Sequence, residues 1–191
     1  KSNEIFARFY TDFVPREGKY NHAAAFPLAA SREVNGKFRP PLSSIVANFN
    51  PPSQDIPSLL SHDEVETLFH EFGHIMHHSL SRTRYSSLAG FSVAHDFVEA
   101  PSQMLENWVW DAKMLERLSG HYKDPKKKLP KDLIEKMIAA RQFNNGYFYT
   151  RQLVFGLFDY EIYTAKGKVD PTESFKKIYK KLTGLTPLEK T

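Results

Sequence analysis

The stretch from Ser61 to Leu80 constrains the fold more than any other part of the chain. Ser61 followed by Glu64 has the spacing of a capping box, a pattern that marks the first turn of a helix. Beyond it, apolar residues recur every three or four positions, as they do on the buried side of a helix. They are Val65, Leu68, Phe69, Phe72, Ile75 and Met76. The sequence therefore predicts a helix over 62–80 with one apolar side.

The other side of this helix carries His70-Glu71-Phe72-Gly73-His74, an H-E-x-x-H motif. Residues four apart on a helix lie about 40° from each other and one turn apart, so His70 and His74 can bind one metal ion. The same geometry sets Glu71 beside the ion rather than on it, where a general base is needed. The competing interpretation is a pair of surface histidines solvated by water.

A third ligand decides the class of metal site. The metzincin pattern would place Gly at 77 and His at 80, and the chain has His77 and Leu80, so that class is excluded. A carboxylate from a following helix is the other common solution, and Glu99 is the best candidate. Glu99 is equally well spaced to be the capping-box partner of Asp96, and spacing alone does not choose between these roles.

The rest of the chain predicts a mainly α fold with a small β-sheet (α+β). Residues 1–57 form a strand and loop region, and residues 58–191 form a helical region. Two runs, 23–29 and 43–49, favour strands and are separated by the turn dipeptide Asn35-Gly36. Further helices are expected over 98–118, over 131–165 with a bend near 144–146, and from Asp170 to a stop at Gly184.

Composition excludes several other classes. The 191 residues carry 26 Lys and Arg against 22 Asp and Glu, and a net charge of +4 gives no support for nucleic-acid binding. No apolar run is long enough for a transmembrane helix, so no membrane partner is expected. The absence of cysteine excludes a disulfide scaffold and thiolate ligands. It favours a reducing compartment, the cytoplasm or alternatively an organelle such as the mitochondrion.

The motif and its surroundings resemble the thimet oligopeptidase and neurolysin family of zinc metallopeptidases. That family also includes oligopeptidase A and the peptidyl-dipeptidases. The resemblance extends over nearly the whole chain and is not confined to the motif. It is carried by Tyr10, Asp12 and residues 16–20, by residues 46–49, 62–67, 70–74 and 96–108, and by Arg151-Gln152.

This resemblance implies a zincin-like catalytic domain that holds one Zn²⁺ per chain. The family's two motif histidines and its helix-borne glutamate ligate zinc, which assigns those roles to His70, His74 and Glu99. The family's catalytic glutamate falls on Glu71. The implied activity is that of a metalloendopeptidase, which hydrolyses peptide bonds in short peptides by a zinc-bound water. The alternatives are a peptidyl-dipeptidase, or a fragment that binds zinc or peptide without significant turnover.

Two polar residues are candidates for supporting the metal ligands. Gln103 and Glu106 lie about 40° and 20° from Glu99 on an ideal helix. Either could orient a ligating imidazole through its second ring nitrogen. The competing interpretation is a partly buried polar stripe between two helices.

The strand over 43–49 is a candidate for binding substrate. At the edge of the sheet beside the metal, Ala47, Asn48 and Phe49 would pair with the main chain of an extended peptide. Main-chain contacts do not depend on the side chains of the substrate, so the site would accept peptides of many sequences. A strand in the core is the alternative.

The sequence departs from the family in two respects. Family members are several times longer, and they carry channel walls and a Gly/Tyr-rich loop that supplies substrate-binding residues. The chain is therefore expected to be a piece of a larger peptidase that binds zinc but turns over peptides poorly. Phe91 also stands where a small or hydroxyl residue is expected.

Overall fold

The structure is a computed structural model that describes residues 4–187. The chain divides at Ile134 into two compact units. Every strand of the described residues lies before residue 47, and the first helix begins at His62. The predicted mainly α fold with a small β-sheet is confirmed. Among the described residues, no helix is long and apolar enough to cross a membrane.

The first unit contains a sheet of three strands in the order β1-β5-β2, in which β1 is parallel and β2 antiparallel to β5. A separate hairpin, β3-β4, turns at Asn35 and Gly36, whose φ angles of 52° and 71° are those that this dipeptide favours. The strands are β1 (Arg8–Asp12), β2 (Ala24–Ala29), β3 (Arg32–Val34), β4 (Lys37–Arg39) and β5 (Leu42–Val46).

The expectation that strand 43–49 forms a sheet edge is wrong. β5 lies between β1 and β2, so both of its sides are already paired. The pairing with the first strand's segment continues past β5, where the amides of Ala47 and Phe49 donate to the carbonyls of Asp12 and Phe13, each at 2.8 Å. Ala47 is fully buried and Phe49 is nearly so, and the side chain of Asn48 donates to the carbonyl of Tyr20. Ala47 and Phe49 therefore belong to the core, and the outer strands of the sheet are β1 and β2.

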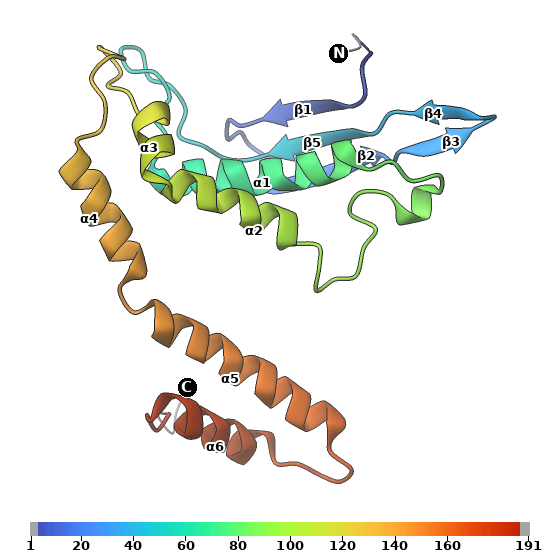
Figure 1. Cartoon of the computed structure of the whole chain (residues 1–191), viewed down its shortest axis with the longest axis vertical. Coiled ribbons are helices and arrows are strands. Elements are labelled where there is room, and N and C mark those ends of the chain that lie inside the picture. Colours follow the sequence, from blue (N-terminus) through green and yellow to red (C-terminus); the bar gives the residue numbers. More distant parts are fainter. Residues whose placement is uncertain (1–3, 188–191) are drawn as a thin grey trace. The chain divides into compact units, whose positions relative to one another are not determined.

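Helix α1 (His62–Leu80) has the predicted bounds. Ser61 Oγ accepts from the Glu64 amide, and the Glu64 carboxylate accepts from the Ser61 amide at 2.8 Å, so the capping box is complete. The helix packs between the sheet and the next helix (Figure 1). Its polar motif therefore sits beside other elements of the first unit rather than in open solvent.

The helix predicted over 98–118 is divided into three pieces. They are α2 (Ala100–Glu106), the 3-10 turn η2 (Asn107–Trp110) and α3 (Ala112–Leu118); another 3-10 turn, η1 (Ser86–Leu88), precedes them. The break falls at Asp111, which has an extended backbone and accepts from the Met114 amide at 3.0 Å. A residue that caps a new helix must lie outside the preceding one, so the long helix cannot continue through Asp111.

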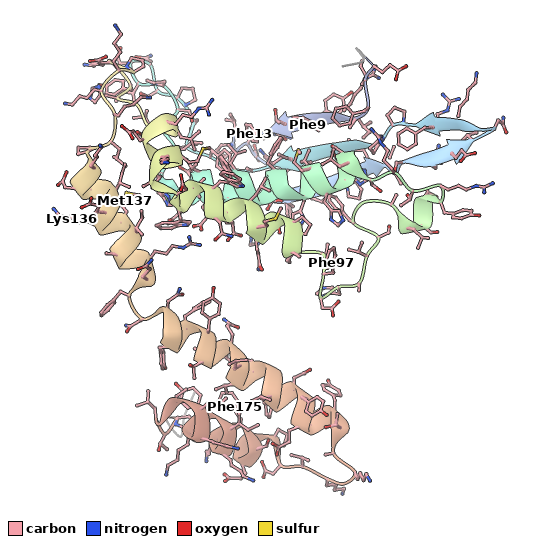
Figure 2. All side chains as sticks on the ribbon, in the orientation of Figure 1. Phe9, Phe13, Phe97, Lys136, Met137 and Phe175 are labelled. Carbon is pink, nitrogen blue, oxygen red and sulfur yellow. The ribbon has the colours of Figure 1, made fainter. Side chains whose placement is uncertain are left out.

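The region predicted over 131–165 contains α4 (Lys131–Gln142) and α5 (Asn145–Thr164), separated by Asn144 at φ 60°. This break confirms the expected bend. In the second unit α5 packs on α6 (Pro171–Thr183), and the Phe175 ring lies 5.5 Å from that of Phe158 (Figure 2). Asp170 caps α6 through the amides of residues 172 and 173, and Gly184 ends it at φ 74°, as predicted.

Helices α1 and α2 cross with backbones almost touching at Gly73. A Cβ built on Gly73 would lie 2.5 Å from the Ser102 Cα and 2.7 Å from the Pro101 carbonyl oxygen. Only glycine allows this approach, because main-chain atoms on the other helix cannot swing away as a side chain would. The close crossing brings Glu99, the residue before α2, to the histidines of α1.

Gly73→Ala is therefore expected to lower the free energy of unfolding by about 1–3 kcal/mol, as overpacking does, and to weaken metal binding by displacing Glu99. Urea unfolding measures the first effect. Gly156→Ala is the matched control, because it lies inside α5 with open space around its Cβ; there alanine should stabilise by about 0.5–1 kcal/mol. Equal effects at both positions would contradict the role of the crossing.

Candidate metal centre

Three side chains from two elements meet at one point of the first unit. His70 and His74 project from adjacent turns of α1, and Glu99 comes from the N-cap position of α2. The Glu99 Oε2 lies 3.2 Å from the His70 Nε2 and 3.1 Å from the His74 Nε2. Ligand atoms bound tetrahedrally to zinc at about 2.0–2.1 Å lie about 3.3–3.4 Å apart. The spacing of the three donors therefore fits a zinc-sized ion.

The hydrogen bond made by His70 fits the same conclusion. Its Nδ1 lies 2.6 Å from the Glu106 carboxylate, and because an ionised carboxylate only accepts, this contact suits a ring that donates from Nδ1. In the neutral ring the Nε2 then presents a lone pair to the Glu99 carboxylate. Two acceptors 3.2 Å apart repel each other unless a proton or a cation lies between them. The arrangement is suited to a cation.

Glu99 is held in place by Ser102, which is fully buried. The Ser102 hydroxyl lies 2.7 Å from the Glu99 Oε2 and 2.9 Å from the Glu99 carbonyl oxygen. Glu99 is the N-cap residue of α2 by position, so its interpretation as a capping-box partner of Asp96 is wrong. Sequence reasoning did not select Ser102, and its position three residues after the candidate ligand was the only available signal.

The pKa shifts of two of these groups keep the donors in their ligating forms. Burial opposes ionisation of Glu99, but the Ser102 hydrogen bond and the two imidazoles outweigh it, so its pKa lies below the usual value. Burial lowers the pKa of His74 despite the nearby Glu99 charge. A metal ligand must be an ionised carboxylate or a neutral imidazole. Both shifts therefore reduce competition from protons.

Of the two residues expected to support the metal ligands, Glu106 and Gln103, one contacts a histidine and the other does not. The Glu106 carboxylate contacts His70 directly, as described above, whereas Gln103 is exposed to solvent.

Glu106→Ala should weaken zinc binding about 10–100-fold, the usual effect of removing a partner that orients a ligating imidazole. Gln103→Ala, three residues earlier on the same short helix, should leave it unchanged. Zinc titration against a chromophoric chelator measures both, and equal affinities for the two variants would refute the assignment.

Glu71 lies beside the three donors and is only 7% exposed. Burial raises its pKa, the proximity of His70 and a hydrogen bond from the Ala25 amide oppose this, and the net change in the pKa is a rise. A carboxylate with a raised pKa is a better proton acceptor near neutral pH. The contact with Ala25 also places Glu71 at the free edge of β2.

A hollow of about 370 Å³ opens at this point. It is lined by Ala23, Ala24 and Ala25 on one side and by the motif residues, Phe91, Val98 and Glu99 on the other. The side chain of Glu99 is 48% exposed, so the site is open to a ligand from solvent. The hollow therefore combines three metal donors, a buried carboxylate and a strand edge.

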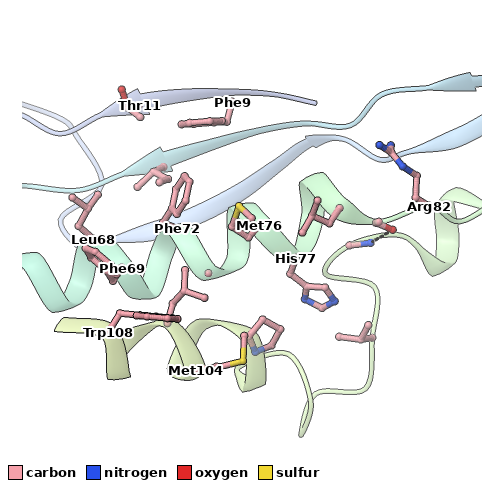
Figure 3. A pocket seen from close by; sticks show the side chains of 18 of the residues that line it. Phe9, Thr11, Leu68, Phe69, Phe72, Met76, His77, Arg82, Met104 and Trp108 are labelled. Atoms are coloured by element: carbon pink, nitrogen blue, oxygen red, sulfur yellow. Dashed lines mark hydrogen bonds between the residues drawn. The ribbon is translucent and has the colours of Figure 1, made fainter. Parts of the chain in front are cut away.

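A larger apolar groove of about 1190 Å³ runs along α1 in the same unit (Figure 3). Phe9 and Phe72 line it on the sheet side, and Met104 and Trp108 line it on the α2 side. None of the three metal donors is among the residues that line this groove. The three clustered donors therefore line the smaller hollow and not the groove.

One other cluster of imidazole and carboxylate groups lies among residues 4–187, formed by His62, Asp63 and Glu66. The His62 Nε2 donates to the Val109 carbonyl at 2.9 Å, and Glu66 accepts from the Trp110 indole at 2.6 Å. Both side chains therefore join α1 to η2. This gives the cluster a structural role in the helix packing.

Comparison with known proteins agrees with this geometry. The model of peptidase family M3 matches residues 1–189, and the chain belongs to that family. Thimet-like oligopeptidase of Dictyostelium discoideum is 50% identical over 165 residues, or 85% of this chain and 24% of that protein. Saccharolysin of Saccharomyces cerevisiae is 44% identical over 168 residues, which cover 87% of this chain and 24% of saccharolysin. Oligopeptidase A of Escherichia coli is 42% identical over 165 residues, which cover 85% of this chain and 24% of that protein.

The family resemblance inferred from the motifs is thus confirmed. The chain spans about a quarter of the length of these curated relatives. The matched segment is the one that contains the three clustered donors and Glu71.

Proposed function

We propose that this chain is the metal-binding part of a zinc-dependent oligopeptidase that hydrolyses peptide bonds in short peptides. The convergence of His70, His74 and Glu99 beside the buried carboxylate of Glu71 carries the proposal. The spacing and protonation of the donors favour one Zn²⁺ per chain, held by two neutral imidazoles and one carboxylate. The relatives named oligopeptidases support a peptidase of this kind.

In the proposed mechanism, Glu71 transfers protons and Glu106 orients a metal ligand. A zinc ion at this site would lower the pKa of a bound water and polarise the scissile carbonyl. Glu71 accepts the proton of the attacking water at its carboxylate and delivers it to the leaving amine. Its raised pKa suits this exchange, because the protonated form must be reachable near neutral pH. The hydrogen bond to Glu106 orients the His70 ring with its Nε2 toward Glu99, where these residues would hold the ion.

The substrate is proposed to bind along the edge of β2. Ala23 and Ala25 line the hollow, and the Ala25 amide faces Glu71 rather than β5. An extended peptide laid beside these residues would place a carbonyl near the three donors, through main-chain hydrogen bonds alone. Pairing along the whole strand is not available, because Pro27 has no amide hydrogen and the Ala29 carbonyl accepts from His78.

A second candidate function is the binding of zinc or peptide without significant turnover. The 48% exposure of the Glu99 side chain favours it, because water is not excluded from the hollow. Action as a peptidyl-dipeptidase is a further alternative for the whole protein.

We propose a cytoplasmic location, with an organelle such as the mitochondrion as the alternative, since the lack of cysteine suits a reducing compartment.

Cleavage of a quenched fluorescent short peptide tests the proposal. The chain is stripped with a chelator, reloaded with zinc, and compared with oligopeptidase A of Escherichia coli as a positive control. We expect cleavage that disappears on stripping and returns with zinc. Zinc bound without any cleavage would select the second candidate, and failure to bind zinc would refute the metal centre.

A further inference from the structure

The two imidazoles of the proposed centre are supported differently on their far sides. The His70 Nδ1 is hydrogen-bonded to the Glu106 carboxylate. The His74 Nδ1 is buried and has no hydrogen-bond partner among residues 4–187. A ligating imidazole ordinarily gains its orientation from a bond at that nitrogen. The ring of His74 therefore lacks the second hydrogen bond that orients the ring of His70.

The ring of Phe91 packs against the ring of His74. It meets the His74 ring edge to face, with centroids 5.6 Å apart and planes at 83°. Edge-to-face aromatic pairs at this separation are attractive and directional. Phe91 comes from the loop between η1 and α2, so its contact with α1 depends on how that loop is fixed.

His78 also packs against the ring of Phe91. The two rings lie 5.0 Å apart at 34°, and His78 is 1% exposed. Its Nε2 donates to the carbonyl of Ala29 at 3.0 Å, which ties the ring to β2. His78 is thus immobilised by a strand on one side and packs on Phe91 with its face.

Gly90 allows the loop to approach this closely. It has φ +55°, and a Cβ on it would overlap the Nδ1 of His78. Its amide donates to the Ser81 hydroxyl at 3.1 Å, which anchors the loop to the end of α1. The loop therefore presents Phe91 in contact with two histidines of the same helix.

We infer that Phe91, backed by His78, is a positioning residue for His74. Phe91 restricts rotation of the His74 ring by packing, in the role that Glu106 fills for His70 by hydrogen bonding. The inference rests on the proposed zinc site, because the orientation of His74 matters only if its Nε2 is a ligand. It predicts that zinc affinity depends on the aromatic ring at position 91.

The test measures the affinity for zinc itself, by competition with a chromophoric chelator, in three variants. Phe91→Ala should weaken zinc binding about tenfold or more, as loss of an orienting contact does. Phe91→Tyr keeps the ring and should restore the affinity of the original chain. Phe97→Ala is the matched control, because Phe97 lies in the same loop and is exposed, and its ring contact is with His77.

The visible absorption spectrum of bound Co²⁺ gives a second readout, since it reports ligand geometry. Phe91→Ala should change this spectrum, whereas Phe97→Ala should not. His78→Gln retains a donor for the Ala29 carbonyl but loses the ring, and it should weaken zinc binding in the same direction. Circular dichroism and thermal unfolding establish that each variant is folded before its affinity is compared.

The outcomes separate this inference from the metal site on which it rests. If the original chain and Phe97→Ala bind zinc but Phe91→Ala binds it equally tightly with an unchanged Co²⁺ spectrum, the positioning role is wrong and the metal site stands. If the original chain binds no zinc, the metal site itself is wrong. A loss of affinity that Phe91→Tyr does not restore would also overturn the role of the ring.

Discussion

Glu71→Gln is expected to lower kcat for peptide cleavage by about 10²–10⁴-fold, the usual contribution of a general acid–base group. Glutamine keeps the size of the side chain but cannot accept the proton of the attacking water. Zinc affinity should be retained, because Glu71 is absent from the three donors that converge on one point. The combination of an intact metal site with lost turnover is specific to a general base.

The measurement is peptide cleavage by the zinc-loaded chain, with the zinc content of each sample determined alongside. Glu66→Gln is the matched control on the same helix, because Glu66 contacts the Trp110 indole and an amide oxygen can accept that bond as well. The control should cleave at the original rate. Equal turnover by the Glu71 variant and the control would remove Glu71 from the mechanism.

Glu99→Gln is expected to weaken zinc binding by more than the roughly 100-fold that marks the upper range for orienting residues. The change removes the anionic oxygen that faces both imidazoles at 3.1–3.2 Å. It also leaves two neutral imidazoles, which neutralise none of the charge of the ion. The Ser102 hydroxyl can still bond to the amide oxygen, so the local fold should survive.

Zinc titration against a chelator measures this effect, and Asp96→Asn is its control. Asp96 is an exposed acid three residues earlier in the chain, and it is not among the three clustered donors. Its variant should bind zinc as tightly as the original chain. Equal losses in the two variants would indicate a general effect of negative charge rather than ligation by Glu99.

The features predicted best from the sequence are those fixed by local geometry. Helix α1 has the predicted bounds because Ser61 and Glu64 cap each other within one turn. His70 and His74 face the same way because helix periodicity alone sets their angle. Gly184 ends the last helix through its own backbone freedom. None of these depends on distant parts of the chain.

The wrong expectations concern contacts between distant segments. The run over 43–49 indicates a strand but not its neighbours, and the missing neighbour was β1, whose pattern was not recognised as a strand. An edge position was therefore expected for a strand that has a partner on both sides. The break at Asp111 had a signal in the sequence, an acidic N-cap before Ala112, which the long apolar pattern obscured.

The candidate metal site combines features set by local helix geometry with contacts between distant segments. The motif gave two candidate ligands directly, while the choice of Glu99 came from family resemblance, because its spacing also suited a capping box. Ser102 contacts Glu99 and Phe91 contacts His74 only because of the close approach of α2 to α1 and the path of the loop. Those contacts depend on tertiary packing, which a pattern of residue types does not encode.

Crystallographic anomalous scattering at the zinc edge tests the central claim most directly. Crystals of the chain loaded with one equivalent of zinc should show a single strong peak in the first unit. The peak should lie about 2.0–2.2 Å from the His70 Nε2, the His74 Nε2 and a Glu99 carboxylate oxygen, with one position left open. A peak at His62, Asp63 and Glu66 instead, or no peak at the three proposed ligands, would contradict the account.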